Sequence, residues 1–184
     1  ATAPAMAQSR LAEFLAKISP ADLAEGADRF GDPEGTPPAA PIFKGSELLG
    51  YAYLNSDVLD ATGYSGKPIH ILVALDVSGR ILGAKLMEHH EPIVLIGIPE
   101  AKITAVINHF RGADVRGMAA GTSQISNPDI VSGATVTVLV IGDSIVRSAL
   151  KMVQAKGLGG AAAASAPEVV TIDTTKAEIE DWQT

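Results

Sequence analysis

The 184-residue sequence contains no cysteine. This absence excludes disulfide bonds, thiolate zinc sites, cysteine-ligated iron–sulfur clusters and cysteine nucleophiles. Aromatic residues make up only 4% of the chain, so few rings are available to stack on a planar ligand. The 14 basic residues are outnumbered by 21 acidic ones, which gives a formal charge of −7, and they form no cluster. We therefore expect no nucleic-acid partner and no surface for anionic membranes.

Long apolar runs are missing as well. The longest lie around residues 93–98 and 136–141, far short of the ~18–20 residues that a membrane crossing needs. We expect neither a membrane span nor a signal peptide within this chain. The first residue is Ala1 rather than Met, so we expect a processed chain, a tagged chain or a piece of a larger protein. Hydrophobic residues still account for 47%, which is enough for a folded core.

The N-terminal part predicts a short helical segment, which we assign to residues 1–35. Ser19-Pro20-Ala21-Asp22 has the cap, the proline and the acidic residue that begin a second helix, and this helix should end before Gly31. Residues 31–41 are rich in Gly and Pro and predict an irregular loop. The first helix is predicted from apolar residues at helical spacing: Leu11, Phe14, Leu15 and Ile18.

The central part predicts an antiparallel meander of three strands. Residues 48–54, 69–77 and 80–87 have strand-like composition. Ser78-Gly79 between the last two is a two-residue hairpin signal. Because such strands follow one another through short turns, they should pair in sequence order.

The C-terminal half predicts helices and one ambiguous segment. Residues 99–110 predict a helix with proline in its first turn, and 117–128 predict a loop. Residues 136–141 are β-branched and favour a strand, although 144–156 are an amphipathic helix.

We place the main domain at residues 36–156. Residues 157–184 are either a linker with the start of a following segment, including a possible strand at 169–172, or a frayed tail.

Most sequence motifs for chemistry are absent. The chain has no G-x-G-x-x-G, no phosphate-binding P-loop and no G-x-S-x-G elbow, and no nucleophile–base pair indicates a hydrolase. His89, His90 and Glu91 are adjacent, and neighbours on a strand point to opposite faces. We therefore interpret them as a polar strand end rather than a metal site.

One segment differs from the rest of the chain in its composition: Asp129-Ile130-Val131-Ser132-Gly133-Ala134-Thr135. It combines an acid, small residues and a threonine before a long apolar run. If Thr135 lies in a first helical turn, its hydroxyl is close to unpaired backbone N–H groups and the positive end of the helix dipole, which suits a phosphate. Gly133 would allow close backbone approach. On these residues alone, an ordinary helix cap with a glycine turn is the stronger interpretation.

This segment resembles the flavinylation motif D-x-x-[ST]-G-A-T of covalent FMN-binding domains, at every fixed position. Such domains occur in Rnf complexes, in Na⁺-pumping NADH:quinone oxidoreductases and in NosR-type proteins. Residues 63–66 resemble the family's G-Y-x-G loop. Residues 89–92 resemble its H-x-E-T-P segment without the threonine, and the sequence that follows is closer to NosR-type proteins. The resemblance covers roughly residues 40–156.

The resemblance implies an α+β fold, with helices packed on a twisted antiparallel sheet. It implies a helix from about Ala134 to Lys156, which resolves the ambiguity above. It also implies that Thr135 carries FMN through a phosphoester. A metal-dependent flavin transferase would install the group from FAD and would recognise Asp129, so Thr135 is a substrate residue and not a catalytic one.

Further cofactor-binding residues follow from the same resemblance. Thr137 either reaches the phosphate or lies on the helix surface. Gly66 is expected to belong to the cofactor site, and Tyr64 of the same loop either stacks on the isoalloxazine or packs on the core. The phosphate is expected to be lined by Ser132, Gly133, Ala134 and Val136, and the flavin edge by His89, His90 and Glu91.

The implied function is electron transfer rather than self-contained catalysis. The chain would be a periplasmic domain of an inner-membrane NosR-type protein that supports nitrous oxide reductase in denitrification. Its partners would be the remainder of that membrane protein, the flavin transferase and the nitrous oxide reductase system. Two alternatives stay open: the flavin domain of an Rnf-type or Na⁺-pumping complex, and a flavin-independent periplasmic sensor or regulatory domain.

Overall fold

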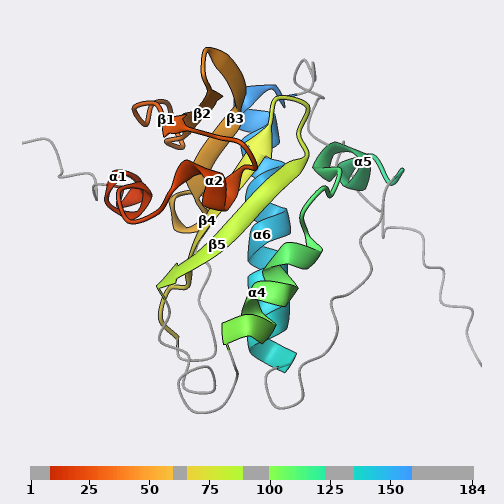
Figure 1. Cartoon of the computed structure of the whole chain (residues 1–184). Helices are drawn as coiled ribbons and strands as arrows, with labels where there is room; N and C mark the ends of the chain where they lie inside the picture. Colours follow the sequence, from red (N-terminus) through yellow and green to blue (C-terminus); the bar gives the residue numbers. More distant parts are fainter. Residues whose placement is uncertain (1–8, 60–65, 89–99, 123–134, 159–184) are drawn as a thin grey trace, which may run out of the picture.

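The computed structural model describes residues 9–59, 66–88, 100–122 and 135–158. Its centre is an antiparallel sheet of five strands in the order β1-β2-β3-β4-β5 (Figure 1). The strands are β1 Arg29–Phe30, β2 Ala40–Lys44, β3 Glu47–Leu54, β4 His70–Asp76 and β5 Ile81–Glu88. The helices are α1 Leu11–Leu15, α2 Pro20–Leu23, the 3-10 turn η1 Asn55–Asp57, α4 Glu100–His109, α5 Val115–Ala119 and α6 Thr135–Lys156. The predicted α+β class is confirmed.

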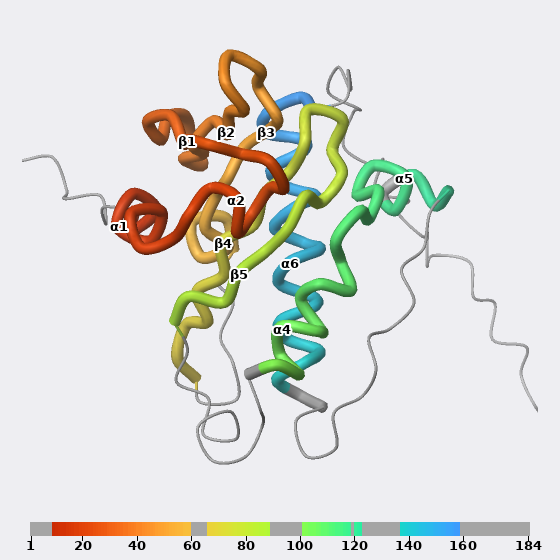
Figure 2. The backbone as a smooth tube through the Cα atoms, in the orientation of Figure 1, coloured from red at the N-terminus to blue at the C-terminus, as the bar shows by residue number. Residues whose placement is uncertain are grey.

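Strand β4 lies between two hydrophobic cores. Ile71, Val73 and Leu75 belong to the core under α4 and α6. Leu72 and Ala74 point to the opposite face and belong to the core under α1 and α2, because successive side chains alternate across a strand. Figure 2 shows the two pairs of helices on opposite sides of the sheet. Burial on both faces explains why this strand is a continuous apolar run rather than an alternating one.

The predicted meander is confirmed by β3, β4 and β5. The hairpin between β4 and β5 turns at Ser78 and Gly79, where Gly79 has a φ of 89°. That left-handed conformation favours glycine. The carboxylate of Asp76 accepts hydrogen bonds from the backbone N–H groups of Ser78 and Arg80, both at 2.9 Å. The local sequence therefore fixes this turn.

The predicted second helix is confirmed, since it spans Pro20–Leu23 and ends before Gly31. Two expectations for the chain outside the meander were wrong. Strand β1 is the edge strand of the sheet and pairs with β2, and β2 begins inside the predicted 31–41 loop. A short helix, α5, covers the start of the predicted 117–128 loop, because the carboxylate of Asp114 caps it by accepting from the N–H of Gly117 at 3.0 Å.

Helix α6 confirms the predicted helix that leads away from the motif. Its inward face is buried, and its outward face is polar apart from the exposed Leu139. The 3.6-residue spacing of apolar side chains therefore overrides the β-branched preference of its first turns. The inward residues include Ile141, Ile145, Ala149 and Met152, and the outward ones Asp143, Arg147, Lys151 and Gln154. The predictions for 159–184 lie outside the described residues.

Among the helices that the structure describes, none has the length and apolar character that crossing a membrane would require.

Candidate functional site

One end of the molecule gathers the chain segments that carry the predicted site. The start of β4, the end of β5 and the starts of α4 and α6 lie at the lower end in Figure 1. His70 and Glu88 are register partners there, since β4 and β5 are antiparallel. Gly66 precedes β4, and Thr135 is the first residue of α6. Several predicted site residues lie outside the described residues: Tyr64, His89, His90, Glu91, Asp129, Ser132, Gly133 and Ala134.

The start of α6 has the electrostatic character that a phosphate requires. Thr135 and Val136 are the first two residues of this 22-residue helix. The first N–H groups of a helix have no acceptor within it and carry about half a positive charge. The first turn of α6 contains no acidic residue, so no carboxylate of that turn repels an anion. These residues therefore fit the phosphate group of FMN.

Thr137 lies in the interior rather than on the helix surface. Its side chain is only 2% exposed, which rules out the surface alternative considered from the sequence. It shares the inward face of α6 with two other buried hydroxyl residues, Ser144 and Ser148, at intervals of seven and four residues. A polar stripe thus runs along the buried side of α6 from its first turn.

A buried asparagine connects this stripe to the sheet. The amide nitrogen of Asn55 donates to the carbonyl oxygen of Ile69 at 2.9 Å and lies 2.8 Å from the hydroxyl oxygen of Ser144. Its amide oxygen accepts from the backbone N–H of Ile71 at 2.7 Å. Asn55 is fully buried. It therefore joins η1, the start of β4 and α6.

A second buried contact lies farther along α6. The hydroxyl groups of Tyr53 and Ser148 are 3.1 Å apart, and burial raises the pKa of the Tyr53 phenol well above its ordinary value. Sequence reasoning missed both contacts. The available signal was the recurrence of small hydroxyl residues on the apolar face of residues 136–156. Asn55 itself gave no signal, because an asparagine after a strand is typical of a turn.

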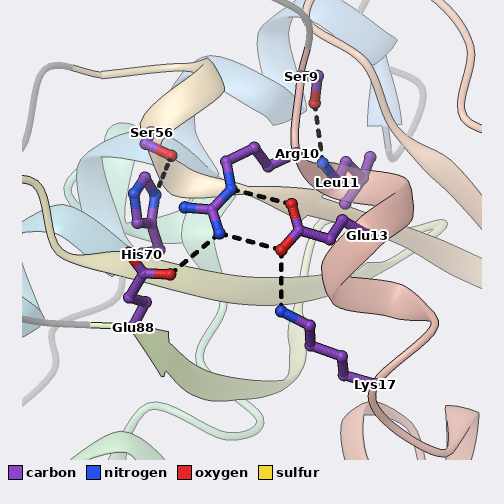
Figure 3. Close-up of polar contacts among 8 residues, drawn as sticks. All are labelled: Ser9, Arg10, Leu11, Glu13, Lys17, Ser56, His70 and Glu88. Carbon is purple, nitrogen blue, oxygen red and sulfur yellow. Dashed lines mark hydrogen bonds and ion pairs between the residues drawn. The ribbon is translucent and has the colours of Figure 1, made fainter.

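A charged cluster fixes helix α1 against the same end of the sheet (Figure 3). The guanidinium of Arg10 donates to the carboxylate of Glu13 at 3.1 and 3.0 Å and to that of Glu88 at 3.0 Å. Lys17 donates to Glu13 at 2.8 Å. Hydrogen bonds from Arg10 and Lys17 lower the pKa of Glu13 to about 2. Arg10 thereby holds the last residue of β5, directly before the predicted His89 segment.

His70, the first residue of β4, lies beside this charged cluster (Figure 3). The ring nitrogen Nδ1 of His70 lies 2.8 Å from the hydroxyl oxygen of Ser56 (Figure 3). The ring of Phe14 in α1 contacts the His70 ring with a centroid distance of 5.6 Å. Before β4, Gly66 has a φ of 72°, so a glycine is favoured at that position of the predicted G-Y-x-G loop.

The class of protein follows from a comparison with known families. Residues 63–151 match the family described as FMN-binding domain. The matched region begins before β4 and ends within α6. It therefore contains the start of β4, the end of β5 and the starts of α4 and α6. This part of the chain therefore belongs to the FMN-binding domain family.

Individual relatives narrow the class further. The chain is 43% identical over 148 residues to the regulatory protein NosR of Pseudomonas aeruginosa, covering 78% of this chain and 21% of NosR. It is 41% identical over 124 residues to the protein NirI of Paracoccus denitrificans, covering 67% of this chain and 18% of NirI. It is also 35% identical over 100 residues to one component of the ion-translocating oxidoreductase complex of Escherichia coli O157:H7, covering 50% of this chain and 48% of that component. The chain thus spans about a fifth of NosR and NirI.

Proposed function

We propose that this chain is a flavin-carrying electron-transfer domain in which FMN is attached through a phosphoester to the hydroxyl of Thr135. The observation that carries the proposal is that Thr135 begins α6 inside the region that matches FMN-binding domains. The D-x-x-S-G-A-T sequence that ends at Thr135 supports it. The first turn without acidic residues supports it as well.

The attachment step transfers a group without redox change. A flavin transferase would supply FAD. The Thr135 oxygen forms a bond to the phosphorus on the FMN side, the pyrophosphate P–O bond breaks, AMP leaves, and the hydroxyl proton passes to solvent. Because an unassisted threonine hydroxyl is a weak nucleophile, the transferase and its metal ion provide the activation, and Asp129 belongs to the sequence that it recognises.

The residues of this chain would hold and orient the cofactor. Bound FMN supplies chemistry that connects two-electron and one-electron partners. Backbone N–H groups at the start of α6, with Ser132, Gly133, Ala134 and Thr137, would hold the phosphate. Tyr64 would stack on the ring, and the segment after β5 would lie near the flavin edge: His89, His90 and Glu91.

The biological setting that we propose is a NosR-type membrane protein with this domain on the periplasmic side. There it would support nitrous oxide reductase during denitrification. The match to NosR, 43% identity over 78% of the chain, is more extensive than that to the ion-translocating oxidoreductase component, 35% over 50%. This difference favours the NosR-type setting over the Rnf-type setting.

The proposal is tested by retention of flavin in acid. The chain is produced in the periplasm with and without a flavin transferase and precipitated in acid, and FMN absorbance is measured in the pellet. We expect retained flavin only with the transferase, and none in Thr135→Val. Thr104→Val is the matched control, because Thr104 is an exposed threonine of another helix, α4. Covalent flavin in Thr135→Val would contradict the assignment, and a wild-type chain without flavin would favour the regulatory alternative.

A further inference from the structure

We infer that the hydrogen bond between Asn55 and Ser144 is a positioning contact that sets where α6 presents Thr135 for flavin attachment. This inference rests on the proposed function. Asn55 and Ser144 do not touch the attachment point. They act through the helix that carries it.

Most of the inward face of α6 cannot fix the helix along its axis. Ile141, Ile145 and Ala149 are at most 2% exposed and pack on the sheet as aliphatic side chains. Such contacts are non-directional, so they tolerate small sliding or rotation of the helix. Directional hydrogen bonds in a buried environment select one arrangement, because any other leaves a buried polar group unpaired.

The three hydrogen bonds of Asn55 have the geometry to fix one position of α6 against the sheet. Both its donor bonds and its acceptor bond are directed at specific atoms, two of them on the backbone at Ile69 and Ile71 and one on Ser144. Among the described residues, no buried side-chain nitrogen or oxygen lacks a partner. The link therefore holds α6 against the start of β4, directly after the predicted G-Y-x-G loop.

The part of α6 between Ser144 and Thr135 is a short, continuous stretch of helix. Ser144 follows Thr135 by nine residues (144 minus 135), which is about 13–14 Å along a helix that rises about 1.5 Å per residue. Both residues belong to the uninterrupted helix α6. A displacement at Ser144 is therefore passed on to Thr135. Group transfer is sensitive to such shifts, since a misplacement of about 1 Å can cost about 100-fold in rate.

Ser148 provides a matched control one helical turn farther from Thr135. It is as buried as Ser144, at 0% against 2%, and it also makes a hydroxyl contact with the sheet, to Tyr53. Its hydroxyl also donates to the Ile145 carbonyl of its own helix at 3.1 Å. Tyr53 lies in β3 and does not contact the start of β4 through this bond, so losing the Ser148 contact leaves the Asn55 link intact.

The experiment measures flavin transfer to the purified apo-chain with FAD and a flavin transferase. Acid-stable flavin is followed over time at several chain concentrations, which separates kcat from KM, and thermal unfolding is recorded for each variant. We expect Ser144→Ala to lower kcat for transfer about tenfold, while Ser148→Ala stays within about twofold of wild type at a similar loss of stability. Alanine is a strong helix former, so both variants should retain α6.

Ser144→Thr keeps the hydroxyl and adds a methyl group in a packed interior. We expect it to lose stability through overpacking and yet to retain transfer at near the wild-type rate. Equal rates in Ser144→Ala and Ser148→Ala, or rates that follow the unfolding midpoint across all three variants, would overturn the inference. Either result leaves the proposed function standing, because that proposal fails by different results: flavin accepted by Thr135→Val, or no flavin accepted by the wild-type chain.

Discussion

Arg10 shows how one side chain joins segments that are distant in sequence. Its guanidinium contacts Glu13 within α1 and Glu88 at the end of β5, and it lies 4.5 Å above the centre of the Phe14 ring. Because these groups are partly exposed, each contact adds little stability alone. Their combined effect is to fix the last residue of β5, from which the predicted flavin-edge residues continue.

The depressed pKa of Glu13 predicts a pH dependence of stability. Its folded-state pKa is about 2 against an ordinary value of 4.5. The carboxylate therefore stabilises the fold above pH 4.5, and this contribution is lost as the pH falls towards 2. We expect Glu13→Gln to lower the thermal midpoint near neutral pH and to flatten its decline between pH 4.5 and 2.

The control is Glu25→Gln, which removes an exposed carboxylate from the turn after α2. Its midpoints should run parallel to those of wild type across the same pH range. A Glu13→Gln curve that is also parallel to wild type would show that the Arg10–Glu13–Lys17 contacts do not stabilise the fold.

At the scale of elements, the close approach of α2 to β5 depends on a glycine. A β-carbon on Gly83 would lie 2.3 Å from the carbonyl oxygen of Leu23, which is far inside van der Waals contact. That oxygen belongs to the backbone and cannot move aside without moving α2. The contact therefore requires the absence of a side chain at this position.

We expect Gly83→Ala to destabilise the chain by about 1–3 kcal/mol, as overpacking does in well-packed interiors. Lys85→Ala is the matched comparison, because it removes the exposed ion pair between the same two elements, Lys85 and Asp22 at 3.3 Å. Exposed pairs contribute about 0–1 kcal/mol. Urea unfolding measures both, and a Gly83→Ala loss no larger than that of Lys85→Ala would contradict the steric account.

The sequence predicts an element where local signals and packing agree, and it fails where they differ. The β4–β5 hairpin was predictable because Ser78-Gly79 supplies a turn between apolar runs. Residues 136–141 favoured a strand, and only the family resemblance indicated a helix. Strand β2 was missed because Pro41 and nearby glycines indicate a loop, whereas its pairing is made with β3, a partner that no local window contains.

The site was predictable to a different degree. The position of Thr135 at the start of a helix followed from the motif and its resemblance. The Asn55–Ser144 contact did not, since its partners are 89 residues apart. Buried polar contacts of this kind depend on how the helix lies against the sheet, and composition or spacing alone does not encode that.

For the whole molecule, the N-terminal helices complete the sheet. Leu11, Phe14, Leu15 and Leu23 are at most 7% exposed and cover the face of the sheet opposite α6. Burial of each such side chain contributes about 1.5–3 kcal/mol, or about 6–12 kcal/mol for the four. That sum is comparable to the whole stability of a domain, about 5–15 kcal/mol.

A chain that begins at residue 28 should therefore unfold at a much lower temperature and aggregate, because it exposes an apolar sheet face. A chain that begins at residue 9 keeps every contact that the structure describes and should unfold like the full chain. Calorimetry with light scattering checks both. A residue-28 chain that unfolds cooperatively at the full-length midpoint would show that α1 and α2 are dispensable.

The most direct test of the central claim is to locate the flavin on the chain by mass spectrometry. Trypsin should release residues 117–147, between Arg116 and Arg147, from the transferase-treated chain. We predict that this peptide gains the mass of FMN less one water and that fragmentation assigns the gain to Thr135. Assignment to Thr137 or Ser132, or an unmodified peptide from a chain that retains flavin in acid, would contradict the account.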